Sequence, residues 1–100
     1  MAKFNELVAG EMPVLVDFYA EWCGPCKTMG PILHQVKDEL KEGVRIIKID
    51  TDRNPSLSNK FQVRSVPTLM LFQKGEMKWR QSGIVQARDI VRLVEQHSKN

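Results

Sequence analysis

The chain has 100 residues, 42% of them hydrophobic, and a formal net charge of +3. This length fits a single domain over residues 1–100, with enough apolar side chains for a core that needs no metal or disulfide staple. The Lys and Arg residues are scattered along the chain rather than clustered, which predicts solvated charged faces and argues against a nucleic-acid partner.

No stretch approaches the ~20 apolar residues of a membrane-spanning helix, and the first residues lack the apolar segment of a signal peptide. We therefore expect a soluble protein with no membrane partner and a cytoplasmic location. A mature form that has lost a signal peptide would have the same sequence, so this location is an inference.

Hydrophobic periodicity predicts helices and strands in alternation. In chain order they are a helix over residues 3–10, a strand over 14–19, a helix over 24–42, a strand over 44–50, a short helix from Asn54-Pro55, strands over 68–72 and 76–82, and a helix over 86–98. We expect Gly43 to end the second helix and Asn54 to cap the third. The order predicts an α/β fold of three layers, in which four helices cover both faces of a four-stranded mixed sheet.

The two cysteines of the chain, Cys23 and Cys26, lie where the first strand passes into the long helix. Unpaired N–H groups and the positive end of the helix dipole stabilise an anion at that point, so we expect Cys23 to be an exposed nucleophile of low pKa. Cys26 lies one turn further along the helix and is expected to be buried. The pair can therefore reduce a disulfide by attack of Cys23 and resolution by Cys26.

Three other interpretations of this pair are open. A structural disulfide would close too short a loop to stabilise the fold by much. A zinc site needs about four ligands, and beyond the cysteines the chain offers His34 and His97, so we expect no metal. Two inert buried cysteines are the third interpretation, against which the neighbouring Trp22, Gly24 and Pro25 argue.

Asp17 is a carboxylate in an otherwise apolar strand. Burial there would raise its pKa toward neutrality. We expect it to take and return the proton of Cys26 during resolution, through a water molecule. The alternative is an aspartate that reaches solvent at the end of the strand.

The segment Asp17-Phe18-Tyr19-Ala20-Glu21-Trp22-Cys23-Gly24-Pro25-Cys26-Lys27 resembles the active-site segment of the thioredoxin family. The similarity continues in Pro31, in Asp50-Thr51-Asp52 with Asn54-Pro55, in Val66-Pro67-Thr68 and in Gly83. It extends over nearly the whole chain from about residue 13.

The resemblance implies more than the residues themselves indicate. It implies a cis bond before Pro67, beside the disulfide, and pairing of the Val66 backbone with an extended substrate. It implies a docking surface, which consists of Trp22, Gly24, Pro25, Val66, Pro67 and Gly83, with Ile84 as a further candidate. It also implies a general protein-disulfide reductase that binds no cofactor and is itself reduced by thioredoxin reductase, an NADPH-dependent flavoenzyme. We expect a monomer.

Two departures from the family pattern are expected. The residues before Pro13 read as a helix, so the usual first strand is missing and the 44–50 strand becomes an edge, with Arg45 and Lys48 to discourage pairing. The family often has a lysine near the buried aspartate, four residues before the position matching Asp50, and this chain has Ile46 there. Lys48 shares the face of Ile46 by strand alternation.

Two other functions remain open at this stage. One is a disulfide oxidase or isomerase, although Gly24-Pro25 between the cysteines resembles reductases more closely. The other is a non-enzymatic thioredoxin-like interaction module, which would need the docking surface without turnover.

Overall fold

A computed structural model describes residues 2–98. The helices of this part of the chain are α1 (Ala2–Leu7), α2 (Gly24–Leu40), α3 (Pro55–Lys60) and α4 (Ala87–His97), with a 3-10 turn at Lys41–Gly43. The strands are β1 (Val14–Tyr19), β2 (Arg45–Asp50), β3 (Thr68–Gln73) and β4 (Glu76–Ser82). Element types and order agree with those predicted from hydrophobic periodicity.

The strands form one mixed sheet in the order β2-β1-β3-β4. β1 is parallel to β2 and antiparallel to β3, which is antiparallel to β4. The β3–β4 hairpin turns at Lys74 (φ 56°) and Gly75 (φ 79°). Two successive positive φ values are those of a type I′ turn, which matches the twist of the strands. β2 is an edge strand, as predicted.

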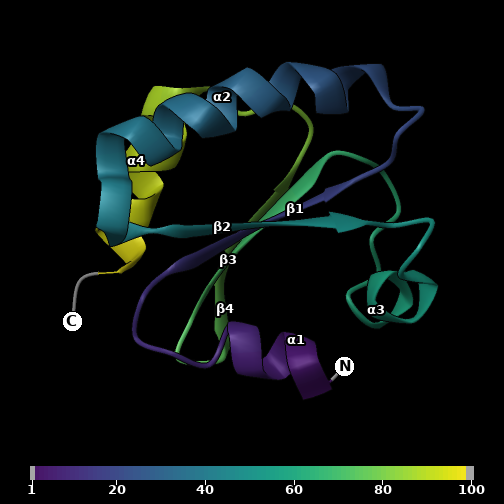
Figure 1. Ribbon diagram of the computed structural model, residues 1–100, viewed down its shortest axis with the longest axis horizontal. Helices are drawn as coiled ribbons and strands as arrows, with labels where there is room; N and C mark the ends of the chain where they lie inside the picture. Colours follow the sequence, from purple (N-terminus) through teal and green to yellow (C-terminus); the bar gives the residue numbers. More distant parts are fainter. Residues whose placement is uncertain (1, 99–100) are drawn as a thin grey trace.

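Strand alternation divides the core between the two faces of the sheet. Helices α2 and α4 cover one face, and α1 and α3 cover the other (Figure 1). On one face Leu15 of β1 and Leu69 and Leu71 of β3 pack against α2 and α4. On the other face Val16 and Phe18 pack with residues of α1 and α3. The three-layer α/β fold is therefore confirmed.

Contacts between aromatic rings hold α1 against the face of the sheet that it shares with α3. The Phe4 ring lies 5.4 Å from that of Phe61 and 5.5 Å from that of Phe72, measured between centroids. Arg80 of β4 secures the end of α3, because its guanidinium donates to the carbonyls of Phe61 (2.5 Å) and Gln62 (2.9 Å). Both contacts hold the segment that leads from α3 to β3.

The predicted C-terminal end of α2 is wrong in detail. α2 ends at Leu40, and its C-cap is Lys41 with φ 49°, rather than Gly43. The Lys37 ammonium donates to the carbonyls of Lys41 (2.7 Å) and Val44 (2.6 Å), which satisfies backbone groups after the helix without a glycine. Asn54 is the N-cap residue of α3, as predicted, but its side chain donates to the Asp50 carbonyl (2.9 Å) and makes no capping hydrogen bond to the helix.

Candidate active site

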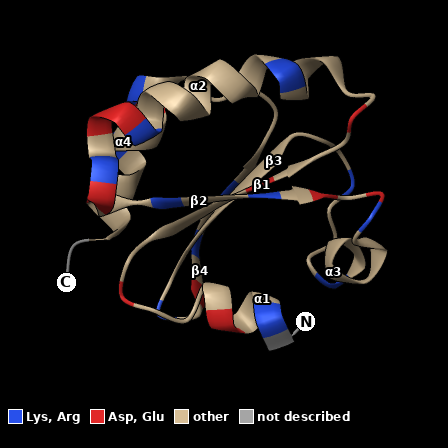
Figure 2. Cartoon of the chain, in the orientation of Figure 1, with Lys and Arg blue, Asp and Glu red and all other residues tan. Residues whose placement is uncertain are grey.

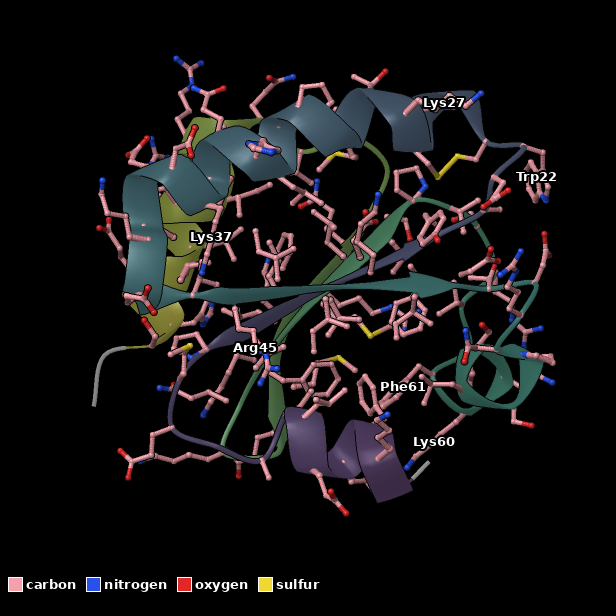
Figure 3. The ribbon with its side chains drawn as sticks, in the orientation of Figure 1. Trp22, Lys27, Lys37, Arg45, Lys60 and Phe61 are labelled. Atoms are coloured by element: carbon pink, nitrogen blue, oxygen red, sulfur yellow. A yellow bond between two sulfur atoms is a disulfide. The ribbon has the colours of Figure 1, made fainter. Side chains whose placement is uncertain are left out.

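The cysteine pair lies at the junction of β1 and α2, where Cys23 and Cys26 form a disulfide. In Figure 3 it is the yellow bond near the labelled Trp22 and Lys27. Cys23 is the N-cap of α2, with extended backbone, and Pro25 lies in the first turn. The backbone N–H of Cys26 donates to the Cys23 sulfur over 3.1 Å. One sulfur thus receives both a direct N–H donor and the positive end of a 17-residue helix.

The expected exposure of Cys23 is wrong for this disulfide form. Cys23 is 3% exposed and Cys26 is 6% exposed. The Cys23 sulfur lies 3.6 Å from the carbonyl oxygen of Val66, and the pair packs against Ala20 and Tyr19. The cover comes from a loop 43 residues away, which local sequence around the cysteines does not reveal.

That covering loop contains a cis peptide bond between Val66 and Pro67, as the resemblance implied. The N–H of Gly83 donates to the Pro67 carbonyl over 2.8 Å, and Gly83 has φ 93°, a conformation that favours glycine. Thr68 adds a bond to the Ser65 carbonyl (2.7 Å). The structure therefore brings Val66, Pro67 and Gly83 together beside Cys23.

The remaining predicted docking residues form the exposed side of the site. Trp22 is 72% exposed, and Gly24 and Pro25 are exposed beside it. The indole N–H of Trp22 donates to Asp52 over 2.9 Å, and the N–H of Asp52 donates in turn to Asp50 over 2.9 Å. The side chain of Trp22 is therefore oriented by a loop after β2. Sequence reasoning missed this role of Asp52.

Asp17 is fully buried in β1, and neither carboxylate oxygen has a hydrogen-bond partner within residues 2–98. Burial raises its pKa to about 6, while the positive charge of Lys48 acts in the opposite direction. Asp17 shares the sheet face of Leu15, which packs under α2, and Cys26 is among the buried residues of α2. The interpretation of Asp17 as a solvated strand-end residue is wrong.

Asp17 has a cationic neighbour, a point that the sequence left open. Lys48 is its register partner on β2, and the two side chains share the α2 face of the sheet. The lysine ammonium lies 4.9 Å from the centroid of the Tyr19 ring.

Two further searches concern the described part of the chain alone. Within residues 2–98 no group of three or more His, Cys, Asp or Glu side chains is placed to hold a metal ion. No helix in the same range has the length and apolar character needed to cross a membrane.

A family model described as Thioredoxin matches residues 1–96. The chain belongs to the thioredoxin family. Among thioredoxin relatives, a thioredoxin-like protein of Synechocystis sp. is 45% identical over 95 residues, which are 94% of this chain and 90% of that protein. The thioredoxin of Rickettsia typhi is 42% identical over 87 residues, which are 87% of this chain and 83% of that protein.

Solved thioredoxin structures have the same fold. A mutant thioredoxin from Halobacterium salinarum matches with a TM-score of 0.89 at 31% identity, over 100% of this chain and 87% of that one. Chloroplastic thioredoxin z matches with a TM-score of 0.86 at 35% identity, over 95% of this chain and 87% of that one. Thioredoxins are thiol–disulfide oxidoreductases that need no cofactor, and this chain has their redox-active cysteine pair as a disulfide.

Proposed function

We propose that this thioredoxin reduces protein disulfides through a mixed disulfide on Cys23. We assign Cys23 as the attacking sulfur because the Cys26 N–H donates to it over 3.1 Å at the start of α2. An N–H donor and a helix N-terminus both favour the thiolate, which is the form that attacks a disulfide.

The cycle transfers two electrons and two protons to the substrate. The Cys23 thiolate attacks one substrate sulfur, the substrate S–S bond breaks, and the released substrate thiolate takes up a proton. Cys26 then loses its proton and attacks Cys23, which breaks the mixed disulfide, and the second substrate sulfur leaves as a thiolate that takes up a proton. The enzyme is left with the Cys23–Cys26 disulfide.

Asp17 accepts the proton of Cys26 in the second step. A carboxyl group with a pKa of about 6 is a workable proton acceptor near neutral pH. Its burial on the α2 face of the sheet, beneath the helix that carries Cys26, supports this role.

Substrates dock on the surface around Cys23, beside the exposed Trp22, Gly24 and Pro25. The half-buried Val66 backbone pairs with an extended substrate segment, and Pro67 and Gly83 hold the loop that presents it. This arrangement suits a stretch of unfolded or loop-borne chain around a substrate cysteine.

Reducing equivalents come from an external NADPH-dependent flavoenzyme, thioredoxin reductase, which regenerates the dithiol. We propose that the protein acts as a monomer and contributes to redox homeostasis. A cytoplasmic location stays a prediction.

NADPH-coupled reduction of a protein disulfide in the presence of a thioredoxin reductase tests the activity. We expect steady turnover that disappears in Cys23→Ser. The exposed serine variant Ser56→Ala serves as the control and should keep wild-type turnover. Failure of the wild-type protein to turn over with any of several thioredoxin reductases would contradict the reductase assignment.

Trapping distinguishes the roles of the two cysteines. Cys26→Ser should accumulate a stable mixed disulfide with the substrate, whereas Cys23→Ser should not. The reduction potential separates a reductase from an oxidase, because a value more oxidising than the glutathione pool would favour the oxidase. Full biological activity of the double variant Cys23→Ser, Cys26→Ser would favour an interaction module.

A further inference from the structure

The outer edge of β2 presents backbone groups for strand pairing. The N–H groups of Arg45 and Thr51 point inward, since they donate to the carbonyls of Pro13 and Tyr19 over 2.9 Å each. Successive N–H groups of a strand alternate in direction, so those of Ile46 and Lys48 point outward. Within residues 2–98 no strand pairs with this edge. In Figure 1, β2 crosses in front of the other strands.

A groove of about 500 Å³ lies between this edge and α2. Its apolar part consists of Gly30 and Leu33 of α2 and the half-buried Ile46 of β2. The groove therefore offers apolar contact area directly beside unpaired backbone groups, the combination that an added strand uses.

The groove adjoins a pocket at the redox site. A second pocket of about 500 Å³ is lined by Cys26 and Tyr19 and shares Gly30 and Lys48 with the first. An extended segment lying along β2 would thus run toward the side of α2 that carries Cys26.

The charges along the groove select an anionic occupant. Arg45 and Lys48 line it together with Lys37, whose ammonium is already bound to the carbonyls of Lys41 and Val44, and with one carboxylate, Asp38. The two cations of β2 are the blue segments of that strand in Figure 2. Arg45 and Lys48 lie on opposite faces of the strand by alternation, and Figure 3 shows Lys37 and Arg45 on either side of its ribbon. Because side chains of a paired strand also alternate, one acidic residue can meet a cation on each face.

We propose that the outer edge of β2 docks an extended, acidic segment of a partner protein as a fifth strand of the sheet. A second copy of the chain is a poorer occupant, because pairing two β2 strands would bring together two sets of Arg45 and Lys48, and like charges across a strand pair are destabilising. This docking site is separate from the Val66 backbone and does not depend on turnover at Cys23.

The test uses the oxidised full chain and a blocked eight-residue peptide in which Val-Val pairs alternate with Glu-Glu pairs. Amide chemical shifts report where the peptide binds, and its affinity is measured at low and high salt. We expect the shift changes to centre on Ile46, Lys48 and Leu33, and the affinity to fall with salt. A peptide N-methylated at alternate residues, which cannot pair fully, should not bind.

Arg45→Glu should weaken binding by about tenfold, because it places a carboxylate beside the glutamates. Arg88→Glu, which reverses an exposed arginine on α4, is the matched control and should stay within about twofold of wild type. Either variant should keep wild-type disulfide reduction. Absence of binding at millimolar peptide, equal weakening by both variants, undiminished binding of the N-methylated peptide, or self-association through β2 in sedimentation would each overturn the proposal.

Discussion

Asp17 and Lys48 are register partners on neighbouring strands, and the carboxylate is fully buried while the lysine is exposed. The carboxylate has no hydrogen-bond partner within residues 2–98, so it is desolvated without compensation from neutral donors. Burial raises its pKa to about 6, and the nearby ammonium limits the rise. The charge of an exposed lysine therefore lowers the pKa of a buried carboxyl group.

Asp17→Asn should stabilise the protein at alkaline pH. The folded state raises the pKa of Asp17 to about 6, above its unfolded value, so the folded protein binds the extra proton. The contribution of protonated Asp17 to stability is therefore fully present below about pH 4 and is lost as the pH rises through about 6. The asparagine avoids this loss, and we expect a gain of up to about 3 kcal/mol at pH 8 and little change at pH 4.

Urea unfolding of the oxidised protein at both pH values measures this gain. Asp38→Asn, an exposed aspartate of α2, is the control and should change stability by less than about 0.5 kcal/mol at either pH. A gain of the same size at pH 4 and pH 8 would contradict titration of Asp17 as its cause.

Asp17→Asn should also slow the resolution of the mixed disulfide above about pH 6, because the proton of Cys26 loses its acceptor. Stopped-flow reduction of a model mixed disulfide between pH 5 and pH 9 measures the rate directly. An unchanged pH profile would remove Asp17 from the proton path, whatever its effect on stability.

Lys48→Met should raise the pKa of Asp17 further, because the lysine charge acts to lower it. The carboxyl carbon of Asp17 can be titrated by NMR, and the midpoint should move above about 6. The pH profile of resolution should move in the same direction. Lys60→Met is the matched control, and an equal shift in that variant would mean that the effect is not specific to the Asp17–Lys48 pair.

Asp52→Ala removes the acceptor that orients the indole of Trp22. Because this bond is exposed, we expect a stability loss of at most about 1 kcal/mol. We expect KM for a protein disulfide to rise severalfold while kcat changes little, since docking rather than chemistry is disturbed. Asp38→Ala is the control. A fall in kcat at constant KM would place Asp52 in the chemical steps instead.

Arg80→Met should lower the free energy of unfolding by about 1 kcal/mol, because the guanidinium spans two carbonyls, those of Phe61 and Gln62. Arg80→Lys should recover less than half of this loss, since an ammonium lacks the planar fork that reaches both acceptors. Chemical unfolding checks both variants. Full recovery by lysine would show that charge alone carries the contact.

The elements and much of the site were predictable because they depend on short-range pattern. Continuous apolar runs mark β1 and β3, and the stripe from Met29 to Val36 marks the buried side of α2. The position of Cys23 at the start of α2 follows from the same pattern.

The errors concern features that distant residues determine. The cover on Cys23 comes from Val66, far along the chain, and no local pattern indicates it. The end of α2 depends on where the flexible side chain of Lys37 finds acceptors. The cationic partner of Asp17, which the sequence left open, depends on the β1–β2 register, and this register places Lys48 opposite the carboxylate.

The loop that covers the cysteines is synthesised after them, which matters for the nascent chain. Pro67 follows Cys26 by 41 residues, so at ordinary elongation rates both thiols exist for roughly 2–8 s before their cover is translated. During that interval the nascent chain carries an unshielded dithiol. The cover seen in the disulfide form can be completed only after β3, which follows Pro67 directly, has been made and has paired with β1.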